Sequence, residues 1–184
     1  AGLIQLEKYD YALDYIFGLS EEQQEITELL TKNIRDDSIA GLLLGKYERA
    51  KELRIKLEID RSTCFRELPS CLQRGELVII IGNLLENAFD AVRMEKPERR
   101  KVFFSMLDTP KGLTITVRDT GPGIPAERRE SIFQRGFSTK GSANCGLGLY
   151  LVKRYVNMCG GSISIQDADG GGAVFNINIP KEQG

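Results

Sequence analysis

Three polar side chains recur at helical spacing within one of the most apolar stretches of the chain. Asn83, Asn87 and Asp90 stand at positions i, i+4 and i+7 of residues 77–92, which are otherwise apolar nearly all round. This spacing places the three on one face of a helix. Because buried amides are costly without partners, the stripe needs either a hydrogen-bond network with neighbouring strands or a polar ligand. Its oxygens would suit a hard cation such as Mg²⁺, which takes few protein ligands alongside phosphates and water.

A second polar motif, residues 119–125, follows an expected strand. Asp119 would stand at the strand end, where a carboxylate can accept a hydrogen bond from an exocyclic amine. Gly121 and Gly123 permit a tight backbone and the close approach of a ligand. Taken alone, the motif fits an ordinary Asp-Gly turn equally well.

A third motif, the glycine-rich segment 141–148, runs into the start of an expected helix. A helix N-terminus with mobile backbone before it suits phosphate. The segment is not a P-loop, since no Gly-Lys-Ser/Thr follows, and Gly146-Leu147-Gly148 lacks the third glycine of a dinucleotide fingerprint.

Hydrophobic periodicity predicts the elements that position these motifs. Apolar residues at helical spacing predict helices at 6–17, 26–34, 39–53, 77–92 and 147–158. Alternation predicts strands at 55–59, 102–106, 113–117, 162–166 and 173–179, the second and third forming a hairpin. The stretches at 6–17 and 26–34, which can form one helix continuous through Gly18, together carry an apolar face that would pack on a partner helix or cover the domain that follows.

The formal net charge of −1 gives no electrostatic case for nucleic acid or an anionic membrane as a partner. The chain contains no histidine, which excludes a His-based triad, a His-ligated metal and a phosphohistidine on this chain. Any charged ligand must therefore be bound by other groups.

The size of 184 residues predicts one main domain with a short helical extension. Cys64, Cys71, Cys145 and Cys159 match neither a zinc ribbon nor a redox pair, and we expect them to be reduced. No run reaches the roughly 20 apolar residues of a membrane helix. Because the chain starts without methionine and inside an apolar pattern, we expect a soluble piece of a longer protein.

The motifs together resemble a known family. Residues 83–88, 119–124, 132–140 and 146–153 are similar, in order, to the N, G1, F and G2 boxes of the histidine kinase catalytic domain, in the GHKL superfamily. The resemblance covers about residues 36–180. It implies a two-layer α/β sandwich, the Bergerat fold, with a mixed, mainly antiparallel sheet and helices on one face.

The resemblance also implies roles for individual residues in binding ATP and Mg²⁺. Asn87 would hold Mg²⁺, with Asn83 supporting the metal and phosphate site, and Asp119 would accept from the adenine amino group. The other implied ATP-binding positions are Asp90 beside this stripe; Gly121, Gly123 and Ile124 at the base pocket; Phe133, Phe137, Ser138, Thr139 and Lys140 in a lid; and Gly146, Leu147, Gly148 and Leu149 near the phosphates. Lys140 is equally compatible with a solvated lid lysine.

Residues 2–6, 9–16 and 39–46 resemble the citrate- and dicarboxylate-sensing subfamily. That resemblance implies an acceptor histidine upstream of this chain, a dimerisation segment at residues 1–35 and an ATP-binding catalytic domain at 36–184. It further implies a homodimeric kinase, a response regulator as partner, and a cytoplasmic position below an inner-membrane sensor whose membrane spans are missing here.

Two other functions are compatible with parts of the sequence. ATPases and protein serine kinases of the same fold resemble each other in placing a glutamate general base four residues before the metal-binding asparagine. Here that position is Asn83, which favours a histidine kinase over an ATPase. The second alternative is a catalytically silent nucleotide-binding or dimerisation module.

Overall fold

The computed structural model describes residues 21–137 and 146–181. Its sheet has the strand order β1-β2-β3-β5-β4, made of β1 (Lys56–Ile59), β2 (Lys101–Thr109), β3 (Gly112–Asp119), β4 (Ser162–Asp167) and β5 (Ala173–Pro180). The β1 and β2 strands pair in parallel, and every other pairing is antiparallel. The predicted mixed, mainly antiparallel sheet is confirmed.

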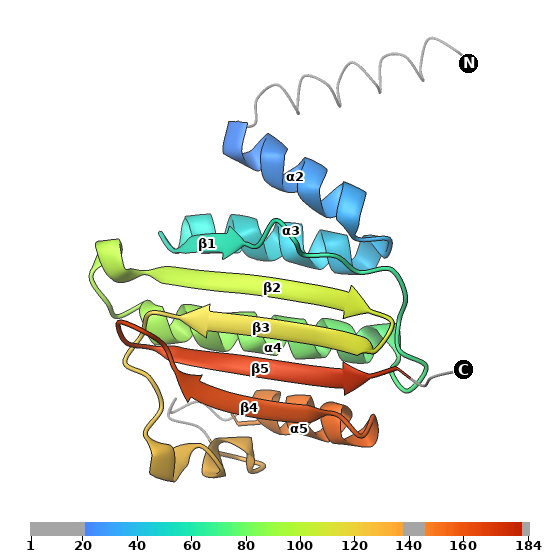
Figure 1. Ribbon diagram of the computed structural model, residues 1–184. Helices are drawn as coiled ribbons and strands as arrows, with labels where there is room; N and C mark the ends of the chain where they lie inside the picture. Colours follow the sequence, from blue (N-terminus) through green and yellow to red (C-terminus); the bar gives the residue numbers. More distant parts are fainter. Residues whose placement is uncertain (1–20, 138–145, 182–184) are drawn as a thin grey trace.

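Three helices lie behind the sheet in Figure 1: α3 (Asp37–Glu52), α4 (Arg74–Val92) and α5 (Gly148–Met158). Burial alternates along β2, β3 and β5, where every second residue is buried. Because successive side chains of a strand point to opposite faces, the buried residues share the face of the sheet that the helices cover. Facing them, α4 buries apolar residues along its whole length: Leu77, Ile80, Ile81, Leu84, Leu85, Ala88, Phe89 and Val92. This central helix is therefore fixed against the sheet, and so are the polar residues on its remaining face.

Short turns complete the described part of the chain. They are the 3₁₀ turns η1 (Pro97–Arg99), η2 (Ala126–Arg128) and η3 (Ser131–Phe133), of which η2 and η3 follow β3. The sequence patterns did not predict them, because three-residue turns have no periodicity. They bring the segment after β3 to the side of the sheet that α4 and α5 occupy.

The N-terminal described helix is α2 (Glu21–Asn33), which packs on α3. Its Leu30 is fully buried, and Ile34, just after it, forms a parallel bridge with Phe65. The expected helix at 6–17 lies outside the described residues. The proposed division between residues 1–35 and 36–184 stays a prediction.

The expectation that the cysteines are reduced is wrong for one pair. Cys71 and Cys159 form a disulfide with 5.3 Å between their Cα atoms. Cys71 lies just before α4 and Cys159 just after α5, so the bond joins neighbouring ends of two packed helices. Cys64 is a free, half-buried thiol, and Cys145 lies outside the described residues.

Within the described ranges, no helix has the length and apolar character needed to cross a membrane.

Candidate functional site

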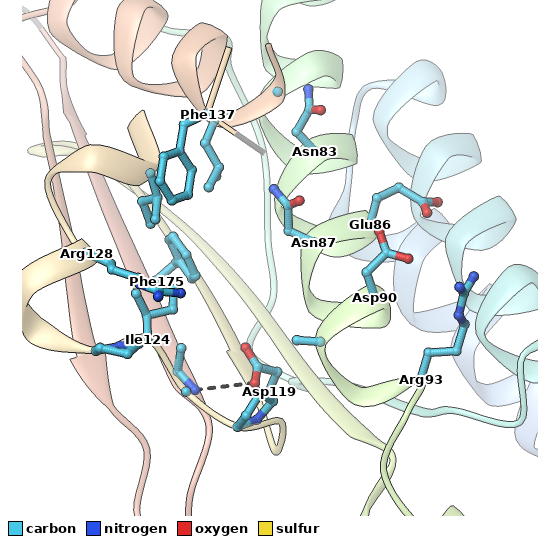
Figure 2. A pocket seen from close by; sticks show the side chains of 18 of the residues that line it. Asn83, Glu86, Asn87, Asp90, Arg93, Asp119, Ile124, Arg128, Phe137 and Phe175 are labelled. Carbon is cyan, nitrogen blue, oxygen red and sulfur yellow. Dashed lines mark hydrogen bonds between the residues drawn. The ribbon is translucent and has the colours of Figure 1, made fainter. Parts of the chain in front are cut away.

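A cavity of about 700 Å³ opens between α4 and the segments that follow β3, a size typical of sites for small molecules and cofactors. Figure 2 shows α4 on one side and the η2 region with β5 on the other. Ten of the residues predicted for the site line it: Asn83, Asn87, Asp90, Asp119, Gly123, Ile124, Phe137, Gly146, Gly148 and Leu149. Motifs separated by more than sixty positions in the sequence thus share one cavity.

The polar stripe of α4 forms one wall of this cavity. The Asn83 side-chain nitrogen donates to the Ile79 carbonyl at 2.8 Å, which fixes the orientation of the amide. Asn87, one turn on, makes no side-chain hydrogen bond within the described part of the chain, although it is half-buried. Its amide oxygen is therefore available to a ligand in the cavity.

Glu86 stands at the rim, beside this stripe. Its carboxylate pairs with the Lys46 ammonium on α3 at 2.5 Å, and the two side chains are 44% and 17% exposed. The pair ties α3 to the polar part of α4. It also neutralises one acidic group next to a cavity that is expected to hold an anion.

Asp119 lies at the floor of the cavity and is only 3% exposed. One carboxylate oxygen, Oδ1, accepts from the Gly121 N–H at 2.9 Å and from the Ala173 N–H at 3.3 Å. Burial raises the pKa of this carboxyl above its usual value, against the opposing effect of the two N–H donors. Since Oδ2 accepts no hydrogen bond from the described residues, Asp119 offers the cavity one acceptor in a fixed position.

Gly148 begins α5 and lies directly against the α4 stripe. A Cβ built on Gly148 would come 2.4 Å from Asn83 Oδ1, closer than real contacts allow. Nearby, the Gly136 N–H donates to the Gly146 carbonyl at 3.0 Å, which holds residues 136 and 146 together. The helix N-terminus that was predicted to suit phosphate therefore faces the same cavity as Asn83.

Three predicted site residues lie away from the cavity wall. Gly121 is buried behind Asp119, where an added Cβ would come 2.9 Å from the Ala91 carbonyl oxygen. Leu147 is 44% exposed, and Phe133 belongs to the core at 7% exposed, with the Lys153 ammonium 5.1 Å from its ring centroid. Phe133 turns inward because η3 packs against α5. Ser138, Thr139 and Lys140 lie outside the described residues.

The sequence reasoning missed several residues of the cavity wall. Arg128 in η2, Phe175 in β5, and Arg93 and Met94 after α4 all line it. Met94 is 88% exposed, which is unusual for a large apolar side chain. Arg93 and Met94 follow Asp90 at i+3 and i+4, so the helical spacing of the stripe could have predicted them. No local sequence pattern predicts that Arg128 or Phe175 lines the cavity.

The donors present fit a magnesium ion that is bound together with phosphates. Within the described residues, no group of three His, Cys, Asp or Glu side chains could hold a metal ion alone. Mg²⁺ needs only one or two protein oxygens when phosphates and water complete its coordination. The uncommitted Asn87 amide oxygen beside the Gly148 helix start meets that requirement.

The chain is similar over its length to curated sensor kinases. It is 40% identical over 184 residues to a probable C4-dicarboxylate sensor kinase of Halalkalibacterium halodurans, covering 100% of this chain and 35% of the relative. It is 41% identical over 182 residues to the sensor protein CitS of Bacillus subtilis, covering 99% and 33%. The chain thus spans about a third of the length of these relatives.

Solved structures and family models agree with these similarities. The fold aligns with full-length ShkA in complex with AMPPNP at a TM-score of 0.59 and 29% identity, covering 78% of this chain and 30% of that one. This alignment confirms the predicted α/β fold. Residues 73–183 match the family model described as "Histidine kinase-, DNA gyrase B-, and HSP90-like ATPase", and this match contains the helix, the strand end and the glycines that form the cavity. The chain therefore belongs to the histidine kinase-, DNA gyrase B- and HSP90-like ATPase family.

Proposed function

We propose that this chain is the ATP-binding catalytic domain of a citrate- or dicarboxylate-sensing histidine kinase. The observation that carries the proposal is the shared cavity, with the single free acceptor of Asp119 at its floor and the uncommitted amide of Asn87 on its wall. An acceptor at the floor suits an exocyclic amine, and an amide oxygen higher on the wall suits a phosphate-bound cation.

In this proposal different residues bind different parts of the nucleotide. Asp119 Oδ2 accepts from the adenine amino group, while Ile124 and Phe175 provide apolar contact to the base. Asn87 holds Mg²⁺, and Asn83 together with the start of α5 at Gly148 lies at the phosphates. ATP supplies the phosphoryl group, and the chain's contribution is to position it and to place positive charge and N–H donors around it.

The phosphoryl group passes, in the proposed full kinase, to a histidine outside this chain and then to an aspartate of a response regulator. The relatives' names as sensor kinases and the absence of histidine from the 184 residues support this assignment. The kinase would act as a homodimer, with residues 1–35 belonging to the dimerisation element and 36–184 to the catalytic domain. Membrane attachment would come only from segments outside this chain.

Fast hydrolysis of ATP is the less favoured function. The α4 position four residues before Asn87 carries an amide, Asn83, which cannot act as a general base. Glu86 does carry a carboxylate, but it is paired with Lys46 at the rim. The described residues therefore place no unpaired glutamate beside Asn87.

A labelling experiment with Mg²⁺ and ATP carrying a radioactive γ-phosphate tests the proposal. The 184-residue chain should acquire no acid-labile phosphate and should hydrolyse ATP far more slowly than about 10 s⁻¹, a typical enzyme turnover. The same chain extended upstream through its acceptor histidine should become labelled with phosphate that is lost in acid and stable in alkali. Rapid hydrolysis by the short chain, or failure of the extended chain to become labelled, would contradict the proposal.

A further inference from the structure

The wall of the cavity opposite α4 carries a cation that the family motifs do not include. Arg128 ends η2 and lines the cavity, and in Figure 2 its side chain extends from the η2 turn toward the cavity interior, on the side of Ile124 and Phe175. Among the described residues, its guanidinium forms no hydrogen bond or ion pair. A guanidinium directed into a cavity without a protein partner is available to a ligand.

The backbone at this position is held firmly. The Arg128 N–H donates to the Pro125 carbonyl at 2.9 Å, and the Ser131 hydroxyl donates to the Arg128 carbonyl at 3.0 Å. These two bonds fix the position from which the Arg128 side chain extends. Arg128 is exposed overall and lines the cavity from this turn.

The neighbouring arginine has a different, structural task. Arg129 Nε donates to the Ile124 carbonyl at 3.0 Å, and its guanidinium also pairs with Asp167 at the end of β4. Arg129 thus fastens the η2 turn to the sheet. The two adjacent arginines therefore have different roles: Arg129 anchors the turn, and Arg128 faces the cavity.

The position of Arg128 relative to Asp119 decides which part of a nucleotide it would meet. In the proposed site Asp119 binds the base and Asn83 lies at the phosphates. Figure 2 shows these two residues at opposite ends of the cavity, and Gly148 lies against Asn83. Figure 2 places Arg128 on the same side as Ile124 and Phe175, facing the α4 wall and away from Asn83. A planar base slotted against α4 would therefore present its outer face to the guanidinium.

We propose that Arg128 stacks on the exposed face of the adenine ring and closes the base pocket after the nucleotide enters. This inference rests on the proposed nucleotide site and adds a residue to it. The guanidinium is planar and weakly hydrated, so it stacks on aromatic faces in a way that an ammonium group does not. The interaction selects for a flat aromatic base and is independent of the number of phosphates.

Calorimetric titration of the 184-residue chain with ADP and with AMPPNP, in the presence of Mg²⁺, tests this role. Arg128→Ala should weaken the binding of both ligands by the same factor, about tenfold. Arg128→Lys, which keeps the positive charge but has no planar guanidinium, should bind both ligands as weakly as the alanine variant does. Arg128→Tyr, which keeps a planar face and loses the charge, should bind within about threefold of the unchanged chain.

The control is Arg118→Ala, because Arg118 is an exposed arginine of β3 that does not line the cavity, and its removal should leave both affinities unchanged. Unchanged binding by Arg128→Ala would overturn the proposal. Full rescue by lysine, with a greater loss for AMPPNP than for ADP in the alanine variant, would assign Arg128 to the phosphates and also overturn it. Failure of the unchanged chain to bind either nucleotide would instead count against the proposed nucleotide site itself.

Discussion

Gly148 touches the side chain of Asn83 so closely that a Cβ on Gly148 would lie 2.4 Å from Asn83 Oδ1. The contact joins the start of α5 to the polar stripe of α4. The Asn83 amide cannot simply turn away, because its nitrogen is committed to the Ile79 carbonyl at 2.8 Å. The spacing between the two helices at the proposed phosphate end is therefore set by the absence of a side chain at position 148.

Gly148→Ala should weaken binding of an ATP analogue. The added methyl group must push α5 or the Asn83 amide aside, at a cost of about 1–3 kcal/mol, so we expect about ten- to hundredfold weaker binding by calorimetry. Gly82→Ala is the matched control, since Gly82 neighbours Asn83 on α4 and a Cβ there has no heavy atom within 4 Å. The control should bind normally and be as stable as the unchanged chain or slightly more stable. Equal binding by both variants would show that the contact does not matter.

Asp108 should make stability depend on pH. Its side chain is 2% exposed and pairs with the Lys181 ammonium at 2.5 Å, while its other oxygen accepts from the N–H groups of Arg66 and Glu67. Burial pushes the pKa of Asp108 upward, but the Lys181 pair and the two N–H donors outweigh it and hold the pKa below the usual value.

A lowered pKa in the folded state means that ionised Asp108 stabilises the protein above its unfolded-state pKa of about 4, and that this stabilisation is lost as pH falls through the lower folded value. Asp108→Asn should reduce the free energy of unfolding by about 1–3 kcal/mol at pH 7. The difference between the two proteins should shrink as the pH falls below about 4, measured by urea unfolding. A difference that stays constant over this pH range would contradict the assigned role.

Reduction of the Cys71–Cys159 disulfide should destabilise the fold. The bond closes a loop with a sequence separation of 88 and joins the ends of α4 and α5, so its loss should cost about 2–4 kcal/mol. A reductant should lower the thermal midpoint of the unchanged chain and have no further effect on Cys71→Ser. Cys64→Ser, which alters the free thiol, should still respond to the reductant. A midpoint that is insensitive to reductant in every variant would show that the bond does not contribute.

The sequence predicted those features that have a local signature. Residues 77–92 were predicted as a helix because a nearly continuous apolar run of this length is too long for an ordinary buried strand, and the structure forms the helix over Arg74–Val92. Asn83, Asn87 and Asp90 lie together on the cavity wall, because helical spacing puts the three on one face.

The rest depended on contacts between distant segments. Phe175 reaches the cavity only because β5 pairs beside β3, and Arg128 only because η2 turns back toward α4. Phe133, expected in the lid, is instead buried beneath α5, since a motif fixes the order of residues but not which of them faces inward. The disulfide joins two cysteines that no short spacing rule relates.

In the proposed site, Asp119 recognises the base of a bound nucleotide. Asp119→Asn should preserve the fold, because the asparagine oxygen can still accept from the Gly121 and Ala173 N–H groups. Burial already raises the pKa of this carboxyl, so replacing it with a neutral group should cost little stability. The new amide nitrogen would take the place of Oδ2 and face the adenine amino group, donor against donor.

The most direct measurement is calorimetric titration of the chain and of Asp119→Asn with AMPPNP, with and without Mg²⁺. We expect Mg²⁺-dependent binding by the unchanged chain, and binding weaker by about ten- to hundredfold in the variant, which should melt at the same temperature. Equal affinity of the two proteins for AMPPNP, or no binding by the well-folded unchanged chain, would contradict this role of Asp119.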